Sequence, residues 1–148
     1  MASGIRASIF DAFRARLAAQ CTWAKVVNWE QIRIAASDFE DHEIPAIQLW
    51  SPELFHEHQV QTLETTMSIF VEIIMRSQAT GVVDQRELFD KIESVRSAIG
   101  TQTTLGISQM IHVLILGNEV DLHTLEPFYF GRIHFQAVYK EPYTSFCN

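Results

Sequence analysis

The chain has 148 residues, of which 47% are hydrophobic, and it carries a formal net charge of −7. A chain of this length can bury roughly 70% of the surface that its unfolded form exposes, so we expect a single domain over residues 1–148. The charge argues against tight DNA binding, because nucleic-acid binders gather Lys and Arg in patches that neutralise phosphates. Here the 11 basic residues are scattered.

No segment predicts export or a membrane span. The most apolar run, Ile69–Met75, is short and contains Glu72, whereas a spanning helix needs about 20 mostly apolar residues. The amino terminus lacks the apolar block of a signal peptide, so we expect synthesis in the cytoplasm. Cys21 and Cys147 form neither a disulfide framework nor a zinc motif, and we expect two free thiols, with a bridge between subunits as the alternative.

The amino-terminal part predicts one helix and several extended segments. The helix runs over residues 5–17 and ends near residues 19–22, because an apolar residue recurs every fourth position: Ile5, Ile9, Phe13 and Leu17. Residues 26–34 and 44–49 predict strands, and Pro45 belongs at a strand start or a sheet edge. Residues 51–61 predict a loop or an extended arm.

Residues 63–76 predict a long strand, because apolar side chains occupy alternate positions from Leu63 to Met75, with Thr65 as the one exception. The opposite face mixes charged residues with Phe70 and Ile74. At about 3.3 Å per residue such a strand spans roughly 40 Å, more than the usual 5–6 residues require. We expect it to reach beyond the core.

The second helix has the clearest local signature. Asp84 and Glu87 form a capping box at its start, and Gly100 ends it. Its predicted buried stripe consists of four residues: Leu88, Ile92, Val95 and Ile99. Residues 109–116 follow, and their apolar residues on both faces predict a central, covered strand. Gly117 and Asn118 are expected to break it, leaving residues 119–126 as an acidic connection.

Residues 127–140 predict a second long strand with one dry face and one mixed face. The mixed face places Phe128 and Phe130 beside Arg132, which a wholly solvated face would rarely hold. We therefore expect part of it to meet another chain. The predicted interface residues are Phe70, Ile74, Phe128, Phe130, Arg132 and Phe55. The element order predicts an α+β fold, in which a mixed or antiparallel sheet of about four to five strands packs against two main helices.

No catalytic motif is present: there is no nucleophile elbow, no glycine-rich phosphate loop and no Cys–His pair close in sequence. We expect neither enzymatic activity nor a cofactor. His56 and His58 are two residues apart and on a strand would point the same way, which suits two metal ligands. No third ligand accompanies them, so we assign no metal, and a small metal-dependent enzyme remains an alternative.

This order of elements resembles the tail terminator proteins of long-tailed bacteriophages, also called minor tail or tail completion proteins. The resemblance covers nearly the whole chain: an amphipathic helix, a proline-bearing short strand (Ile44–Ile47), a long strand (Leu63–Met75), a capped helix (Asp84–Ile99), and closing strands that end near Tyr139-Lys140.

The resemblance implies a structural virion protein at the head-proximal end of the tail. A homo-hexameric ring would cap the tail tube, stop its polymerisation and present a docking surface to the head connector or neck protein. DNA would pass through the lumen without specific binding, and no membrane is involved. Because an acidic wall would let DNA slide past, we expect Glu119, Asp121 and Glu126 to line this conduit. The alternative within the same machinery is a neck or head–tail adaptor protein.

Overall fold

The computed structural model describes residues 4–29, 38–51, 55–58, 62–77, 84–100, 104–122 and 127–142, and for 55–58, 62–64 and 141–142 the description covers only the backbone. These residues form an α+β fold, as predicted. The elements in chain order are α1 (Ile5–Gln20), β1 (Val26–Asn28), the 3-10 turn η2 (Asp41–Glu43), β2 (Ala46–Trp50), β3 (Phe55–His58), β4 (Thr62–Arg76), α2 (Gln85–Gly100), β5 (Met110–Asp121) and β6 (Phe128–Pro142).

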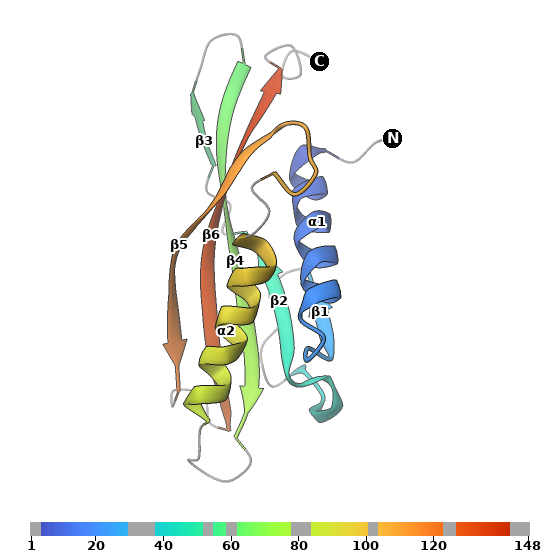
Figure 1. Ribbon diagram of the computed structural model, residues 1–148, viewed down its shortest axis with the longest axis vertical. Helices are drawn as coiled ribbons and strands as arrows, with labels where there is room; N and C mark the ends of the chain where they lie inside the picture. Colours follow the sequence, from blue (N-terminus) through green and yellow to red (C-terminus); the bar gives the residue numbers. More distant parts are fainter. Residues whose placement is uncertain are drawn as a thin grey trace.

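The strands form one mixed sheet in the order β1-β2-β4-β6-β5, and β3 pairs with β4 beside this path. β1 runs parallel to β2, and the other pairs are antiparallel. β4 and β6 pair without a register shift from Thr62↔Pro142 to Arg76↔Phe128, a ribbon of roughly 50 Å. The end of this ribbon that carries β3 projects beyond the helices (Figure 1), as the length of the predicted strands suggested.

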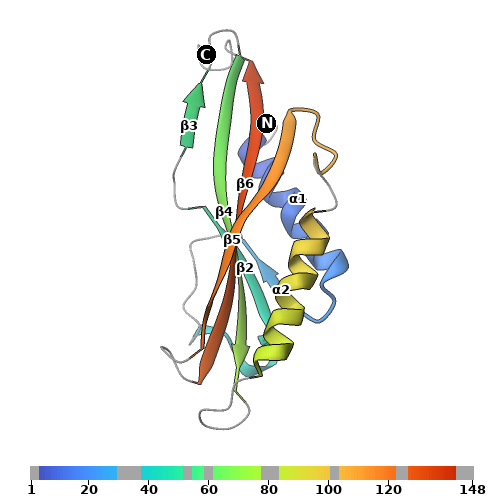
Figure 2. The same ribbon diagram turned by 60° about the vertical axis from the view of Figure 1, so that its left-hand side comes forward.

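Both helices lie on the same face of the sheet (Figure 2). The predicted stripes of both helices pack there against the odd-numbered residues of β4 and β6, and all of their residues are buried except Ile5, which is partly buried. Phe13 of α1 meets Phe135 of β6 edge to face, with 5.4 Å between the ring centroids. Gly131 lets α2 approach β6 closely, because a Cβ atom at this position would lie 2.9 Å from Cδ1 of Ile92. The absence of a side chain at position 131 therefore allows the short distance between α2 and β6.

The two helices begin differently. No side chain caps α1, whose N-cap residue is Gly4, so its stability comes mainly from the packing of its buried stripe. At α2 the predicted cap is present, because Oδ1 of Asp84 accepts a hydrogen bond from the backbone N–H of Glu87 at 2.9 Å. Glu87 also forms an ion pair with Lys91 one turn later, at 2.7 Å.

Two predictions in the extended segments were wrong. β5 is an edge strand rather than a central one, and it continues through Gly117 to Asp121 instead of ending. Register shifts between Met110 and His112 and between Ile115 and Gly117 change which face each residue occupies, so simple alternation misreads this strand. In the segment predicted to be a loop or an extended arm (residues 51–61), residues 55–58 are extended and pair with β4 as strand β3.

Candidate interaction surface

The sheet face opposite the helices, called here the helix-free face, carries the even-numbered residues of β4 and β6. One end of it is covered by the chain itself. Phe39, in the segment before β2, packs with Ile74 and Phe130, and all three are buried. Ile74 is 0% exposed and Phe130 is 6% exposed. The predicted use of these two residues as an outward interface is therefore corrected: a local apolar cluster already covers them.

A polar network lies next along the helix-free face. The carboxylate of Glu72 on β4 is buried, and it accepts hydrogen bonds from Nη2 of Arg132 at 3.1 Å and from Nε2 of Gln48 at 2.9 Å. Arg132 also binds the more exposed Glu119 on β5 through Nη1, at 2.8 Å. One guanidinium on β6 thus links the two neighbouring strands through two carboxylates.

Aromatic rings surround the same guanidinium. The guanidinium carbon of Arg132 lies 5.2 Å from the ring centroid of Trp50 and 5.8 Å from that of Phe70. His134 stacks on Phe70 with 4.5 Å between centroids. Loss of hydration lowers the pKa of His134 from its ordinary value of 6.5, which favours the neutral imidazole. Cation–π contacts of this kind hold Arg132 in one orientation.

A shallow hollow of about 220 Å³ opens beside this cluster. It is lined by Phe70, Leu116, Gly117, Asn118, Glu119, Arg132 and His134. Two buried nitrogen atoms of these residues, Nε of Arg132 and Nε2 of His134, lack a hydrogen-bond partner. The lining of the hollow therefore combines apolar with polar and charged side chains, a composition that suits contact with another protein surface.

The exposed large apolar side chains of the described residues gather along one edge of the sheet. Three of them lie on β5: Leu114 is 43% exposed, Leu116 is 51% and Val120 is 39%. The fourth, Phe89 on α2, is 47% exposed. The sequence did not predict this edge, because the apolar residues on both faces of residues 109–116 indicated a covered strand. No residue of this 12-residue strand marked it as an edge, because it contains none of the Lys, Arg or Pro residues that commonly protect edge strands.

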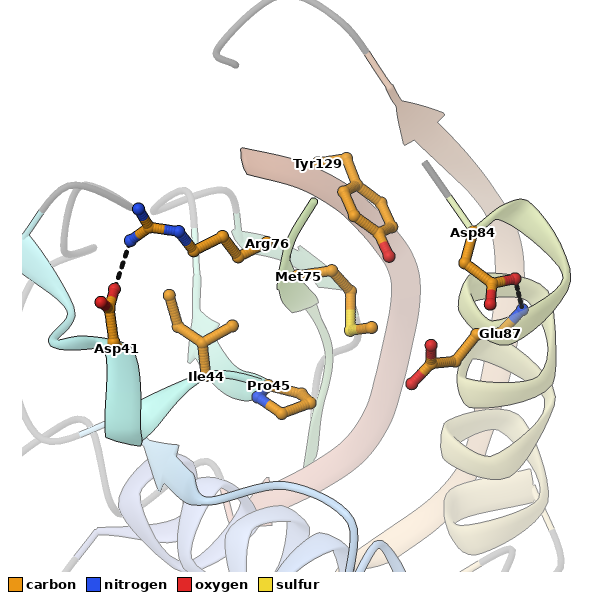
Figure 3. A pocket seen from close by; sticks show the side chains of 8 residues that line it. All are labelled: Asp41, Ile44, Pro45, Met75, Arg76, Asp84, Glu87 and Tyr129. Carbon is orange, nitrogen blue, oxygen red and sulfur yellow. Dashed lines mark hydrogen bonds and ion pairs between the residues drawn. The ribbon is translucent and has the colours of Figure 1, made fainter. Parts of the chain in front are cut away.

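A second hollow, of about 320 Å³, lies where the ends of β4 and β6 meet the start of α2 (Figure 3). It is lined by Asp41, Ile44, Pro45, Met75, Arg76, Asp84, Glu87 and Tyr129. Arg76 and Asp41 form an ion pair at its outer side. Burial raises the pKa of Tyr129, and the nearby carboxylates of Glu87 and Asp84 raise it further, while a backbone hydrogen bond from Asp84 opposes this shift. The phenol therefore stays protonated, and the described residues of this lining include no serine, cysteine or histidine.

The remaining predicted residues are distributed as follows. Phe128 is half-buried, and its ring centroid lies 5.8 Å from the guanidinium carbon of Arg76. Phe55 belongs to β3, where it pairs with Met67, and its side chain lies outside the described residues. Glu119 and Asp121 lie on β5 rather than in a connection, at ladder positions opposite Arg132 and Phe130 and hence on the helix-free face. Glu126 lies outside the described residues.

His56 and His58 both belong to β3, but their side chains lie outside the described residues. Among the side chains that are described, no group of three or more His, Cys, Asp or Glu residues could hold a metal ion. Within the described ranges, neither helix is both long enough and apolar enough to cross a membrane.

The comparisons with known proteins rest on structure alone. No protein-family model and no curated protein matches the chain. Its fold is similar to that of a chain in a solved structure described as the "Virion of native gene transfer agent (GTA) particle", with a TM-score of 0.55 and 10% sequence identity. The match covers 93% of this chain and 95% of that chain. The two chains therefore share a fold over nearly their whole lengths.

Proposed function

We propose that this protein is a structural component of a phage-like virion, and that it acts as a tail terminator. The observation that carries the proposal is the fold shared with a chain of a gene transfer agent virion over 93% of the sequence. Shared fold alone does not fix function. The shared fold is consistent, however, with the order of elements by which the sequence resembles tail terminators.

In the proposed role the protein forms a homo-hexameric ring that caps the tail tube, halts its polymerisation and offers a docking surface to the head connector. A ring needs a contact between two different surfaces of the subunit that closes under rotation. The helix-free face would turn toward the lumen, because it carries Glu119 and Asp121, and like charge would keep passing DNA from adhering. Phe70, Phe128 and Arg132 remain candidates for contact with the tube or with a neighbouring subunit.

The test combines solution mass, negative-stain imaging and binding to purified tail tubes of the cognate particle. We expect annular particles of six subunits, and tubes whose length stops increasing when the protein is added to polymerising tube subunits. Tubes that continue to grow with the protein bound along their sides, or with none bound, would contradict the terminator role. Binding to capsid connectors without binding to tubes would instead establish the neck or head–tail adaptor role.

A further inference from the structure

The end of the β4–β6 ribbon that projects beyond the helices also carries β3, which pairs with β4 beside the main path of the sheet (Figure 1). β3 spans Phe55–His58 and contains two histidines at alternate positions, His56 and His58. Alternate residues of a strand lie on the same face of the sheet, about 7 Å apart. Such a pair supplies two of the ligands that a metal site needs, and the register of the neighbouring strand decides which residues accompany it.

The register between β3 and β4 places a carboxylate residue beside the two histidines. His58 lies directly opposite Glu64, and His56 lies directly opposite Thr66. Residues directly opposite each other in an antiparallel pair share a face, with Cβ atoms about 4.5–5.5 Å apart, and diagonal neighbours such as His56 and Glu64 are separated by about 7–8 Å. Glu64 is an even-numbered residue of β4, where the pairing with β6 has no register shift, so all three residues lie on the helix-free face.

We propose that His56, His58 and Glu64 form a binding site for one divalent transition-metal ion of the zinc class. Two imidazole groups and a carboxylate are a ligand set that Zn²⁺ takes up in protein sites, and they leave a fourth position for water or for a group from a partner. Hard ions such as Mg²⁺ prefer oxygen ligands, so the site should select against them. Hairpin pairing, not proximity in the sequence, brings Glu64 to the histidines.

A lysine competes with the metal ion for this carboxylate. Lys140 on β6 lies directly opposite Glu64 and is exposed, so it shares the helix-free face with the proposed ligands. An exposed cation forms only weak ion pairs, because water and salt screen them. Lys140 should therefore lower the affinity for the metal ion without preventing binding. It also offers a substitution that keeps every ligand and still changes the affinity.

The proposed site joins two strands. β3 pairs with β4 over four residue positions, and the histidines belong to β3 whereas Glu64 belongs to β4. The free energy of metal binding stabilises the structure that brings the ligands together. Binding should therefore hold β3 on β4 and stabilise the projecting end of the ribbon. This effect depends neither on ring formation nor on tube capping.

Calorimetric titration of the metal-free, untagged protein with Zn²⁺ at pH 7 tests the site, and we expect one ion bound per chain. His58→Ala and Glu64→Gln should each weaken binding by about tenfold or more, since even residues that only orient a metal ligand contribute about 10–100-fold. Glu57→Gln is the matched control, because Glu57 lies between the two histidines but opposite Thr65, on the other face, and it should leave the affinity unchanged. Titration with Mg²⁺ should show no binding.

Lys140→Ala tests the site from the opposite direction. The variant keeps all three ligands and removes the competing charge, so it should bind Zn²⁺ about two- to fivefold more tightly. A misfolded variant would not show this gain. In the wild type, amide hydrogen exchange in residues 55–58 should slow when Zn²⁺ is added and stay unchanged when Mg²⁺ is added.

The inference is overturned if the protein binds no stoichiometric Zn²⁺, if the affinity survives Glu64→Gln, or if Lys140→Ala leaves it unchanged. It is also overturned if Zn²⁺ stays bound after His58→Ala, because other residues then hold the ion. A protein that binds Zn²⁺ at this site yet does not cap tail tubes would contradict the proposed function alone. A protein that caps tubes without binding Zn²⁺ would contradict this inference alone.

Discussion

Replacing Arg132 by Met should destabilise the protein by about 3 kcal/mol, because the substitution leaves the buried carboxylate of Glu72 without its cation. Removing one partner of a buried ion pair costs about 3–5 kcal/mol. The lower end applies here, since the Glu72 side chain is 2% exposed but that of Arg132 is 30% exposed and water partly screens the pair. The loss of the Glu119 contact adds little, because the Glu119 side chain is 67% exposed.

A second substitution tests whether the loss of stability comes from the uncompensated charge of Glu72. Glu72→Gln removes the negative charge and should cost about 1 kcal/mol, the scale of one weakened hydrogen bond. In the double variant, Arg132→Met no longer leaves an uncompensated charge, so we expect a loss of about 2 kcal/mol. The double variant should therefore be more stable than Arg132→Met alone.

The assay is urea unfolding at pH 7 and one fixed protein concentration, since self-association would shift the apparent stability. Arg96→Met is the matched control, because Arg96 makes an exposed hydrogen bond to Asn118, and it should change the free energy of unfolding by about 0.5 kcal/mol or less. A loss below about 1 kcal/mol for Arg132→Met, or losses that simply add in the double variant, would refute the view that Arg132 compensates a buried charge.

Three further predictions follow from the packing and from the titrating groups. Gly131→Ala should lower the free energy of unfolding, measured in urea, by about 1–3 kcal/mol, because the added methyl group forces α2 away from β6. Gly117→Ala is the control and should be close to neutral, because no atom lies within 4 Å of its Cβ position. Equal effects of the two substitutions would contradict the close approach of α2 to β6. The pKa of His134 is lowered in the folded state, so the unfolded state binds more protons and the stability should fall as the pH drops through 6.5. This pH dependence of stability should be smaller in His134→Gln. An unchanged profile would exclude His134 as its source. Burial raises the pKa of the Cys21 thiol, and a hydrogen bond with Ser94 offsets this shift only in part. In a Cys147→Ser background, the native protein should therefore react with a thiol reagent far more slowly than the unfolded protein. Similar rates would argue against the burial of Cys21.

The sequence by itself determined the elements whose signals are local and periodic. The capping pair Asp84 and Glu87 and the three- to four-residue spacing of apolar residues along both helices required nothing beyond neighbouring residues, and the structure confirms them. The two long strands were also readable, because period-2 alternation persists along β4 and β6, which pair without a register shift. Such patterns can be read from the sequence because, within one helix or strand, the side on which a residue lies is fixed relative to its neighbours.

Only the tertiary structure decided which apolar residues reach the surface. Ile74 and Phe130 occupy outward positions in their strands, yet Phe39, more than thirty residues away from either, packs over them. The apolar run in β5 resembles a covered strand, but two register shifts and its place at the end of the sheet leave Leu114, Leu116 and Val120 exposed. Strand order and coverage depend on contacts between distant segments, so alternation within one strand carries no information about them.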